Sequence, residues 1–256
     1  MLNQIDIQGI VIIAKEAGNA IMQIYEQDFE VEYKKDNSPL TLADKKANDI
    51  IENGLNQLSV RFPILSEEGK EMPYEDRKHW EYFWLVDPLD GTKEFVKKNG
   101  EFTVNIALIH KDTPVLGVVY APALDICYWA KQGEGAFKDG QRLPLKTESQ
   151  RKTYKIVVSR SHMSDETQAF IDAIDTKKEK ELISIGSSLK ICLVAEGASD
   201  IYPRLGPTME WDTGAAHAIA VESGKNLQKY KDGAYSKYKY NKEYLLNSFF
   251  IVSEVI

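Results

Sequence analysis

Two aspartates at the end of an apolar run are the residues of this chain best suited to chemistry. Asp87 and Asp90 follow the apolar segment 82–86, and Pro88 and Gly91 force the backbone to turn there. The segment predicts a buried strand, and open sheets usually carry their sites at the carboxyl ends of strands. Two close carboxylates repel unless a cation neutralises them, and oxygen ligands without Cys or His favour Mg²⁺ or Mn²⁺. The alternative is a capped turn, since Asp-Pro and Asp-Gly are common turn dipeptides.

Three further acidic residues are candidates for the same site: Asp44, Glu67 and Asp212. Each also has a purely structural interpretation. Asp44 could serve a capping box that begins at Thr41, Glu67 could be a solvated loop charge, and Asp212 could complement a helix N-terminus. Together, an acidic cluster of this kind can hold two Mg²⁺ ions that polarise a phosphoryl oxygen, acidify a bound water and neutralise a leaving oxygen.

Thr92 adds a hydroxyl directly after the two aspartates. A threonine hydroxyl that is bonded to a carboxylate can orient a water and help to deprotonate it. Alternatively, Thr92 caps the following helix, whose free N–H groups could hold a phosphate.

The elements that must position these residues differ between the two halves of the chain. The first half predicts two amphipathic helices, over 10–24 and from Thr41, and then an antiparallel meander of strands. The second half predicts alternating strands and helices, and no internal repeat is visible. The expected strands are 62–66, 82–86, 103–109, 115–120, 126–130, 135–137, 155–159, 182–185, 200–202 and 249–252, with later helices at 165–174, 188–196 and 210–223. The polar segment 146–152 is the expected boundary, which gives domains 1–148 and 149–256.

Composition narrows the classes of protein that this chain can be. The net charge of −7 over 256 residues argues against a protein whose surface coats nucleic acid. Cys127 and Cys192 show no metal-binding spacing and fit a reducing compartment. The N-terminus does not predict a signal peptide, and no segment reaches the ~18 apolar residues of a membrane span. We expect a cytoplasmic protein, with peripheral contact to the inner membrane left open.

Three motifs resemble the signature of the lithium-sensitive, magnesium-dependent phosphatases, a superfamily that includes the inositol monophosphatases. They are Glu67-Glu68, Asp87-Pro-Leu-Asp-Gly-Thr92 and Trp211-Asp-Thr-Gly-Ala215. The resemblance runs from about Asn3 to Val252. Within the superfamily it is closest to the 3′(2′),5′-bisphosphate nucleotidases of the bacterial CysQ type. The segments that carry this closer resemblance are 36–41, 65–68, 84–95, 99–108, 159–162, 185–190 and 202–204.

The resemblance implies an α/β fold of the α+β sugar-phosphatase type, layered αβαβα, with an antiparallel sheet in the first half and a mixed sheet in the second. It also implies roles for particular residues. The metal ligands would be Glu67, Asp87, Asp90, Asp212 and the carbonyl of Leu89, for two or three Mg²⁺ ions with Mn²⁺ as a substitute. Thr92 would work with Asp44 or Glu67 on the attacking water. The substrate contacts would be Asp90, Gly91, Thr92, Lys93, His162, Ser187, Lys190, Arg204 and Asp212.

The basic residues agree with this assignment, because Arg204 and Lys190 lie near predicted element ends and a 5′-phosphate needs a cation beyond the metals. Both could instead be ordinary surface charges.

The implied activity is removal of the 3′-phosphate of adenosine 3′,5′-bisphosphate, with a role in sulfate assimilation. The alternatives are an inositol or sugar phosphatase and a non-catalytic nucleotide sensor. Gly69 departs from the family pattern, which often has an acidic residue there. Oligomeric state and the choice among adenosine 3′,5′-bisphosphate, its phosphosulfate and the 2′ isomer remain open.

Overall fold

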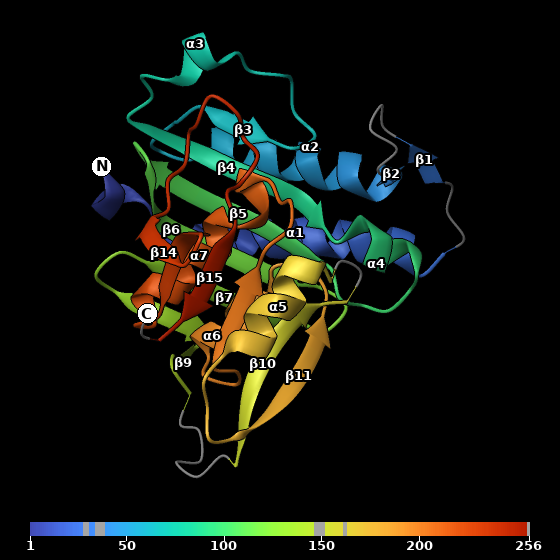
Figure 1. Ribbon diagram of the computed structural model, residues 1–256. Helices are drawn as coiled ribbons and strands as arrows, with labels where there is room; N and C mark the ends of the chain where they lie inside the picture. Colours follow the sequence, from blue (N-terminus) through green and yellow to red (C-terminus); the bar gives the residue numbers. More distant parts are fainter. Residues whose placement is uncertain (28–30, 34–38, 146–151, 161–162, 255–256) are drawn as a thin grey trace.

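The computed structural model describes residues 1–27, 31–33, 39–145, 152–160 and 163–254 (Figure 1). The domain boundary expected at 148 therefore lies outside the described residues. The helices are α1 (Ile7–Tyr25), α2 (Leu42–Asn56), α3 (Tyr74–Arg77), α4 (Thr92–Val96), α5 (Asp165–Ala173), α6 (Leu189–Ala195) and α7 (Gly214–Glu222), with short 3₁₀ turns η1 (Leu2–Gln4) and η2 (Glu210–Asp212). Among these described helices, none combines the length and apolar character needed to cross a lipid bilayer.

The first large sheet has the strand order β3-β4-β5-β6-β7-β8-β9. Its strands are β3 (Ile64–Ser66), β4 (Tyr82–Asp90), β5 (Thr103–His110), β6 (Thr113–Ala121), β7 (Ile126–Lys131), β8 (Gly135–Lys138) and β9 (Gln141–Arg142). Neighbours run antiparallel except β3 and β4, which are parallel. The predicted antiparallel meander is thus confirmed, with one parallel strand at its edge.

The second large sheet is mixed, as predicted, and has the order β11-β10-β12-β15-β13-β14. Its strands are β10 (Thr153–Ser159), β11 (Glu179–Ile185), β12 (Ile201–Arg204), β13 (Asn226–Lys231), β14 (Ala234–Lys237) and β15 (Phe250–Ser253). β10 runs parallel to both of its neighbours, and the remaining pairs are antiparallel. Separately, β1 (Val31–Tyr33) pairs with β2 (Pro39–Thr41).

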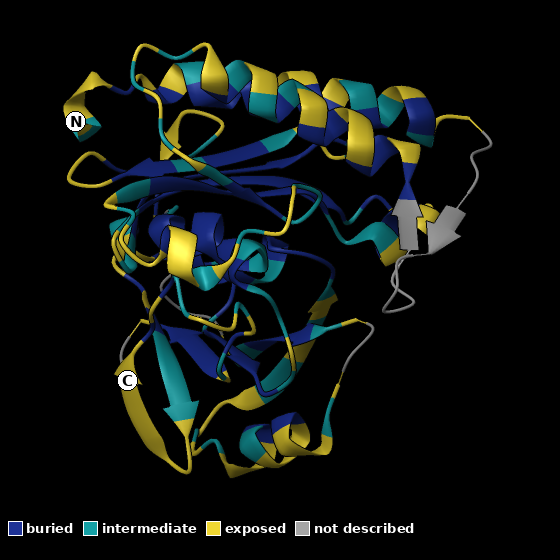
Figure 2. Cartoon of the chain, turned by 90° about the horizontal axis from the view of Figure 1, so that it is seen from above, coloured by how far each residue is buried: buried dark blue, intermediate teal, exposed yellow. Residues whose placement is uncertain are grey.

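Helices and sheets alternate in layers (Figure 2). α1 and α2 cover one face of the first sheet, and α7 covers its other face. α6 packs on α7 and on the second sheet, whose opposite side carries α5. The predicted αβαβα order is therefore confirmed.

The uninterrupted apolar run of β4 follows from this layering. Phe83 and Leu85 point into the core that includes α6 and α7, whereas Trp84 and Val86 point into the core beneath α1 and α2. Because both faces of the strand are covered, the sequence shows no polar alternation.

A close approach fixes the position of α7. A Cβ atom on Gly117 of β6 would lie 2.1 Å from the backbone oxygen of Ala215, so only glycine lets the helix backbone rest on the sheet. α7 begins at Gly214, two residues after Asp212, so this contact helps to fix the position of that aspartate.

Two predicted elements differ from the structure, and two strands of the second sheet were not predicted. β4 continues through Pro88 to Asp90, with a register shift between Asp87 and Asp90 that accommodates the proline. The helix predicted over 210–223 is divided into η2 and α7, because the Asp212 side chain accepts a hydrogen bond from the Met209 N–H. Strands β13 and β14 were not predicted, since their polar, Lys-rich sequence carries little hydrophobic signal.

Candidate active site

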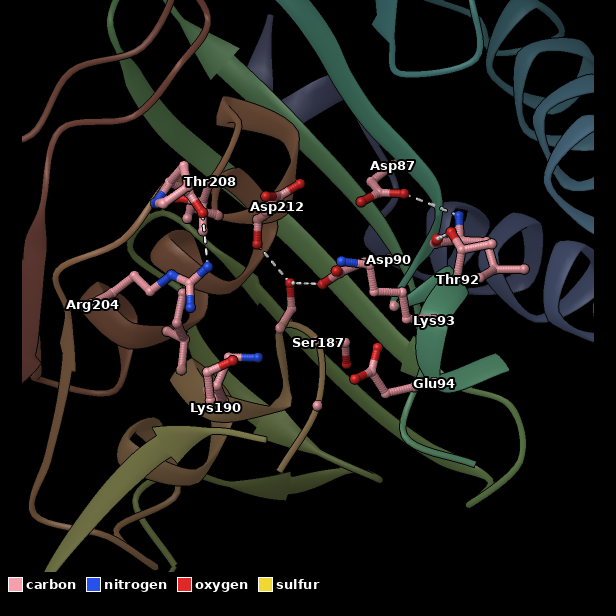
Figure 3. Close-up of a pocket in the computed structure, with 18 of the residues that line it drawn as sticks. Asp87, Asp90, Thr92, Lys93, Glu94, Ser187, Lys190, Arg204, Thr208 and Asp212 are labelled. Atoms are coloured by element: carbon pink, nitrogen blue, oxygen red, sulfur yellow. Dashed lines mark hydrogen bonds between the residues drawn. The ribbon is translucent and has the colours of Figure 1, made fainter. Parts of the chain in front are cut away.

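A pocket of about 300 Å³ opens between the two sheets, and most of the predicted site residues line it (Figure 3). Figure 3 shows two sides. Asp87, Asp90, Thr92, Lys93 and Glu94 come from β4 and α4, while Lys190 and Arg204 project from the α6 and β12 side.

Three of the predicted metal ligands converge at one end of the pocket. Glu67, Asp87 and Asp212 each offer a carboxylate oxygen, and these oxygens lie within 4.8 Å of one another. Glu67 is placed by β3, Asp87 by the neighbouring parallel strand β4, and Asp212 by the turn before α7. Three hard oxygen ligands at this spacing, with no sulfur or imidazole among them, form a donor set that fits Mg²⁺ or Mn²⁺.

The electrostatics of the trio also favour a cation. The pKa of Asp87 is raised well above its ordinary value, chiefly by burial and then by repulsion from Glu67, Asp90 and Asp212. Burial likewise raises the pKa of Asp212, with the Asp90 charge adding to the effect. Burial and mutual repulsion disfavour the negative charges of this site, and a divalent cation that neutralises them would remove this repulsion.

Asp90 lines the same pocket but takes part in a different set of bonds. Its Oδ2 accepts from the Asn105 Nδ2 at 3.3 Å and lies 2.9 Å from the Ser188 Oγ. Asn105 also donates to Ser188 over 2.8 Å, and the Ser188 hydroxyl lies 2.7 Å from the Asp212 backbone oxygen. Ser188 and Asn105 therefore fix the Asp90 carboxylate and connect the two halves of the molecule.

Sequence reasoning did not single out Asn105 or Ser188 as site residues. Both lie within segments that resemble the phosphatases, 99–108 and 185–190, yet a serine or an asparagine on its own indicates no chemistry. Only the fold shows that these two side chains converge on Asp90.

The structure also brings Thr92 and Asp44 together. Asp44 is buried and makes the predicted capping box, since its Oδ2 accepts from the backbone N–H and the hydroxyl of Thr41 at 2.7 Å each. Its Oδ1 lies 3.4 Å from the Thr92 hydroxyl, which lies 3.3 Å from the Leu89 carbonyl oxygen. Asp44 thus serves the cap with one oxygen and faces Thr92 with the other.

Thr92 itself does not cap α4. The N-cap is Gly91, and Thr92 is the first helical residue of a helix that spans only Thr92–Val96. Lys93, the next residue, is exposed at the rim of the pocket.

The opposite wall of the pocket is cationic. Lys190 lies in the first turn of α6, and burial lowers its pKa from 10.5 to about 8. Arg204 ends β12 and is buried, and one of its terminal nitrogens donates to the Pro207 carbonyl over 2.7 Å. Neither the Arg204 Nε nor the hydroxyl of the buried Ser187 has a hydrogen-bond partner among the described residues. These polar atoms are suited to an anionic ligand.

His162, the remaining predicted substrate contact, lies outside the described residues. Every other predicted site residue lines the pocket except Asp44, which reaches it through Thr92.

Comparison with known proteins identifies the group to which this arrangement belongs. The model of the inositol monophosphatase family matches residues 4–254. The chain belongs to the inositol monophosphatase family.

The predicted resemblance to the CysQ type is also confirmed. The 3′(2′),5′-bisphosphate nucleotidase CysQ of Salmonella typhimurium strain LT2 is 49% identical over 223 residues, which cover 86% of this chain and 88% of that protein. CysQ of Escherichia coli strain K12 is 47% identical over the same length, with the same coverage. The crystal structure of CysQ from Bacteroides thetaiotaomicron superposes with a TM-score of 0.86 at 47% identity and covers 96% of each chain.

Proposed function

We propose that this protein is a Mg²⁺-dependent phosphatase that removes the 3′-phosphate of adenosine 3′,5′-bisphosphate and gives AMP and phosphate. The observation that carries the proposal is the polarity of the pocket. One end presents the three carboxylates of Glu67, Asp87 and Asp212, and the other end presents Lys190 and Arg204. A nucleotide with two phosphates can place one at each end, whereas a substrate with one phosphate uses only the acidic end.

The acidic end would bind the metal ions. Glu67, Asp87 and Asp212 would hold them, with Asp90 and the Leu89 carbonyl as further ligands. Bound Mg²⁺, two or three ions with Mn²⁺ as a substitute, would polarise the phosphoryl oxygens and stabilise charge on the leaving oxygen.

The attacking water would be oriented by Thr92. Because the Thr92 hydroxyl can donate its hydrogen to Asp44, its lone pairs are free to accept a hydrogen from a water beside the acidic trio. Glu67, on the same side of the pocket, is the alternative acceptor for the proton that this water loses. The water oxygen bonds to the 3′-phosphorus in line with the departing 3′-oxygen, and the broken P–O bond leaves its electron pair on that oxygen, which then takes up a proton.

The cationic end would bind the 5′-phosphate. Arg204 offers a planar fork with an unused Nε, and Lys190 supplies a point charge. A phosphate dianion beside Lys190 favours its protonated form, so binding would restore the charge that burial disfavours. The Ser187 hydroxyl offers one more donor.

A panel of substrates tests this function directly. Purified protein with Mg²⁺ should release phosphate from adenosine 3′,5′-bisphosphate much faster than from inositol 1-phosphate or fructose 1,6-bisphosphate. Preference for inositol 1-phosphate would instead assign the protein to the inositol phosphatases. Absence of phosphate release from every substrate would favour the non-catalytic nucleotide sensor. Inclusion of the phosphosulfate and the 2′ isomer would rank the three nucleotides.

Arg204→Ala tests whether the cationic wall of the pocket binds the second phosphate. Loss of one charge-assisted pair costs about 1.5–3 kcal/mol, so KM for the bisphosphate should rise roughly 10- to 150-fold. KM for adenosine 3′-monophosphate, which lacks the 5′-phosphate, should not change. Arg142→Ala is a matched control, because that arginine is exposed on β9 and does not line the pocket. Equal effects of Arg204→Ala on both substrates would contradict the assignment of the 5′-phosphate to this wall.

A cytoplasmic location and a role in sulfur metabolism remain part of the proposal. They follow from the resemblance to the CysQ nucleotidases, and growth of a deletion strain on sulfate with and without a reduced sulfur source would test the metabolic role.

A further inference from the structure

An ion pair beside the pocket joins three separate segments of the chain. The Glu101 carboxylate accepts two hydrogen bonds from the Arg160 guanidinium, from Nε at 2.8 Å and from a terminal nitrogen at 2.6 Å. Glu101 precedes β5 of the first sheet, and Arg160 follows β10 of the second. The same terminal nitrogen of Arg160 also donates to the Ser184 carbonyl on β11 over 2.9 Å. The pair thus bonds the two sheets to each other at the rim of the pocket.

The third partner of Glu101 is a backbone group of the pocket itself. The Gly186 N–H donates to Glu101 Oε2 over 2.8 Å. A Cβ atom on Gly186 would lie 2.7 Å from the Glu101 backbone oxygen, so the two backbones are in direct contact. Gly186 begins the turn 186–188, in which Ser187 lines the pocket and Ser188 bonds to Asp90.

The turn needs such support because its backbone is in an uncommon conformation. Ser187 has a φ of +48°, in the left-handed region that non-glycine residues rarely adopt without tertiary restraint. Lys190 lies only three residues after Ser187, at the start of α6. The conformation of the turn therefore determines where the Ser187 hydroxyl and the Lys190 ammonium group point.

We propose that Glu101 and Arg160 are positioning residues for substrate recognition, which hold the turn 186–188 in the conformation that presents Ser187 and Lys190 to the distal phosphate. Neither residue lines the pocket among the described residues, so the pair acts through the turn. The carboxylates of Glu67, Asp87 and Asp212 are placed by other contacts, among them the Met209 N–H that donates to Asp212 and the parallel pairing of β3 with β4. Ser188, the last residue of the turn, keeps its own contacts with Asn105 and the Asp212 backbone oxygen, which hold it beside Asp90. Loss of the pair should therefore weaken substrate binding through Ser187 and Lys190 and leave metal binding intact.

Graded substitutions separate this positioning role from a general contribution to stability. Glu101→Ala removes the acceptor for Gly186 and should raise KM for the bisphosphate about tenfold, with kcat within about threefold of the wild type. Glu101→Gln keeps a carbonyl oxygen for the Gly186 N–H and should raise KM less than Glu101→Ala does. The KM of Arg160→Ala should lie between those of the two Glu101 variants, because Glu101 keeps its bond to Gly186 but loses its fixed orientation.

The matched control is Glu181→Gln. Glu181 pairs with Lys155 at 3.6 Å on the same two strands, β10 and β11, far from the pocket end. This variant removes an ion pair of the same sheet without touching the turn, so its KM should equal that of the wild type.

Two readouts that do not depend on turnover complete the test, since the kinetic part rests on the proposed function. Amide exchange at 186–188 should be faster in Glu101→Ala than in the wild type and unchanged in Glu181→Gln. Mg²⁺ affinity by calorimetry should be the same in all variants.

If the wild type fails to hydrolyse the bisphosphate, the proposed function fails, and the exchange data still decide on the role of Glu101. Unchanged exchange at the turn, or an equal rise of KM in Glu101→Ala and Glu181→Gln, would overturn the positioning role. A loss of Mg²⁺ affinity in Glu101→Ala with normal KM would overturn it as well.

Discussion

Asp87→Asn should make the metal-free protein more stable, although it removes a residue at the centre of the site. The carboxylate oxygens of Asp87, Glu67 and Asp212 lie within 4.8 Å of one another, and Asp87 is almost fully buried. Two unit charges at that distance repel by about 3.5 kcal/mol at an effective dielectric constant of about 20. The asparagine keeps the shape of the side chain and can still accept the 3.1 Å hydrogen bond from the Leu89 N–H.

The measured gain should be smaller than this repulsion. The pKa of Asp87 is raised by burial and by its acidic neighbours, so the metal-free protein already relieves part of the strain by taking up a proton. We expect a gain of about 1–3 kcal/mol in the free energy of unfolding, which is the range of such single-residue effects. Because the folded-state pKa is raised, the folded protein binds more protons than the unfolded chain above the ordinary pKa of 3.8. Wild-type stability in EDTA should therefore fall as the pH rises through the raised pKa, and the variant should show a flatter profile.

Urea unfolding followed by tryptophan fluorescence, in EDTA and in saturating Mg²⁺, measures both effects. In EDTA the variant should be the more stable protein, whereas Mg²⁺ should stabilise the wild type and leave the variant nearly unchanged. Asp49→Asn, an exposed aspartate on α2, provides the control for loss of one charge. An Asp87→Asn variant that is less stable than the wild type in EDTA, and that gains as much stability from Mg²⁺, would contradict repulsion among the three carboxylates.

Three further changes test other parts of the site. Thr92→Ala should lower kcat by about 10²- to 10⁴-fold with little change in KM, and an unchanged kcat in a steady-state assay would remove Thr92 from the handling of the water. Gly117→Ala should cost about 1–3 kcal/mol of stability and weaken Mg²⁺ binding in calorimetry, because its new methyl group meets the Ala215 oxygen and displaces the start of α7. Burial lowers the pKa of His217 from 6.5 to about 3, so the unfolded chain takes up a proton that the folded protein does not. Stability should consequently decline as the pH falls from about 6.5 towards 3, and His217→Gln should reduce this slope in urea titrations.

The sequence by itself determined the chemistry of this protein. Asp87, Asp90 and Thr92 stand together in the chain, and their types and spacing predict a metal site, to which the resemblance of three motifs to the magnesium-dependent phosphatases adds phosphoryl chemistry. The helix that begins at Thr41 was also predictable, because a capping box is a local interaction among neighbouring residues. Strand β4 was predictable for a similar reason, since burial on both faces leaves a continuous apolar run.

The tertiary structure alone decided which side chains meet. Glu67, Asp87 and Asp212 come from three separate parts of the chain, and their approach to within 4.8 Å depends on the parallel pairing of β3 with β4 and on the contact of α7 with Gly117. The bonds of Asn105 and Ser188 to Asp90, and of Glu101 to Arg160 and Gly186, likewise join residues far apart in sequence. A polar residue carries no sign of its distant partner, because hydrogen bonds depend on positions that only the packing of the two sheets defines.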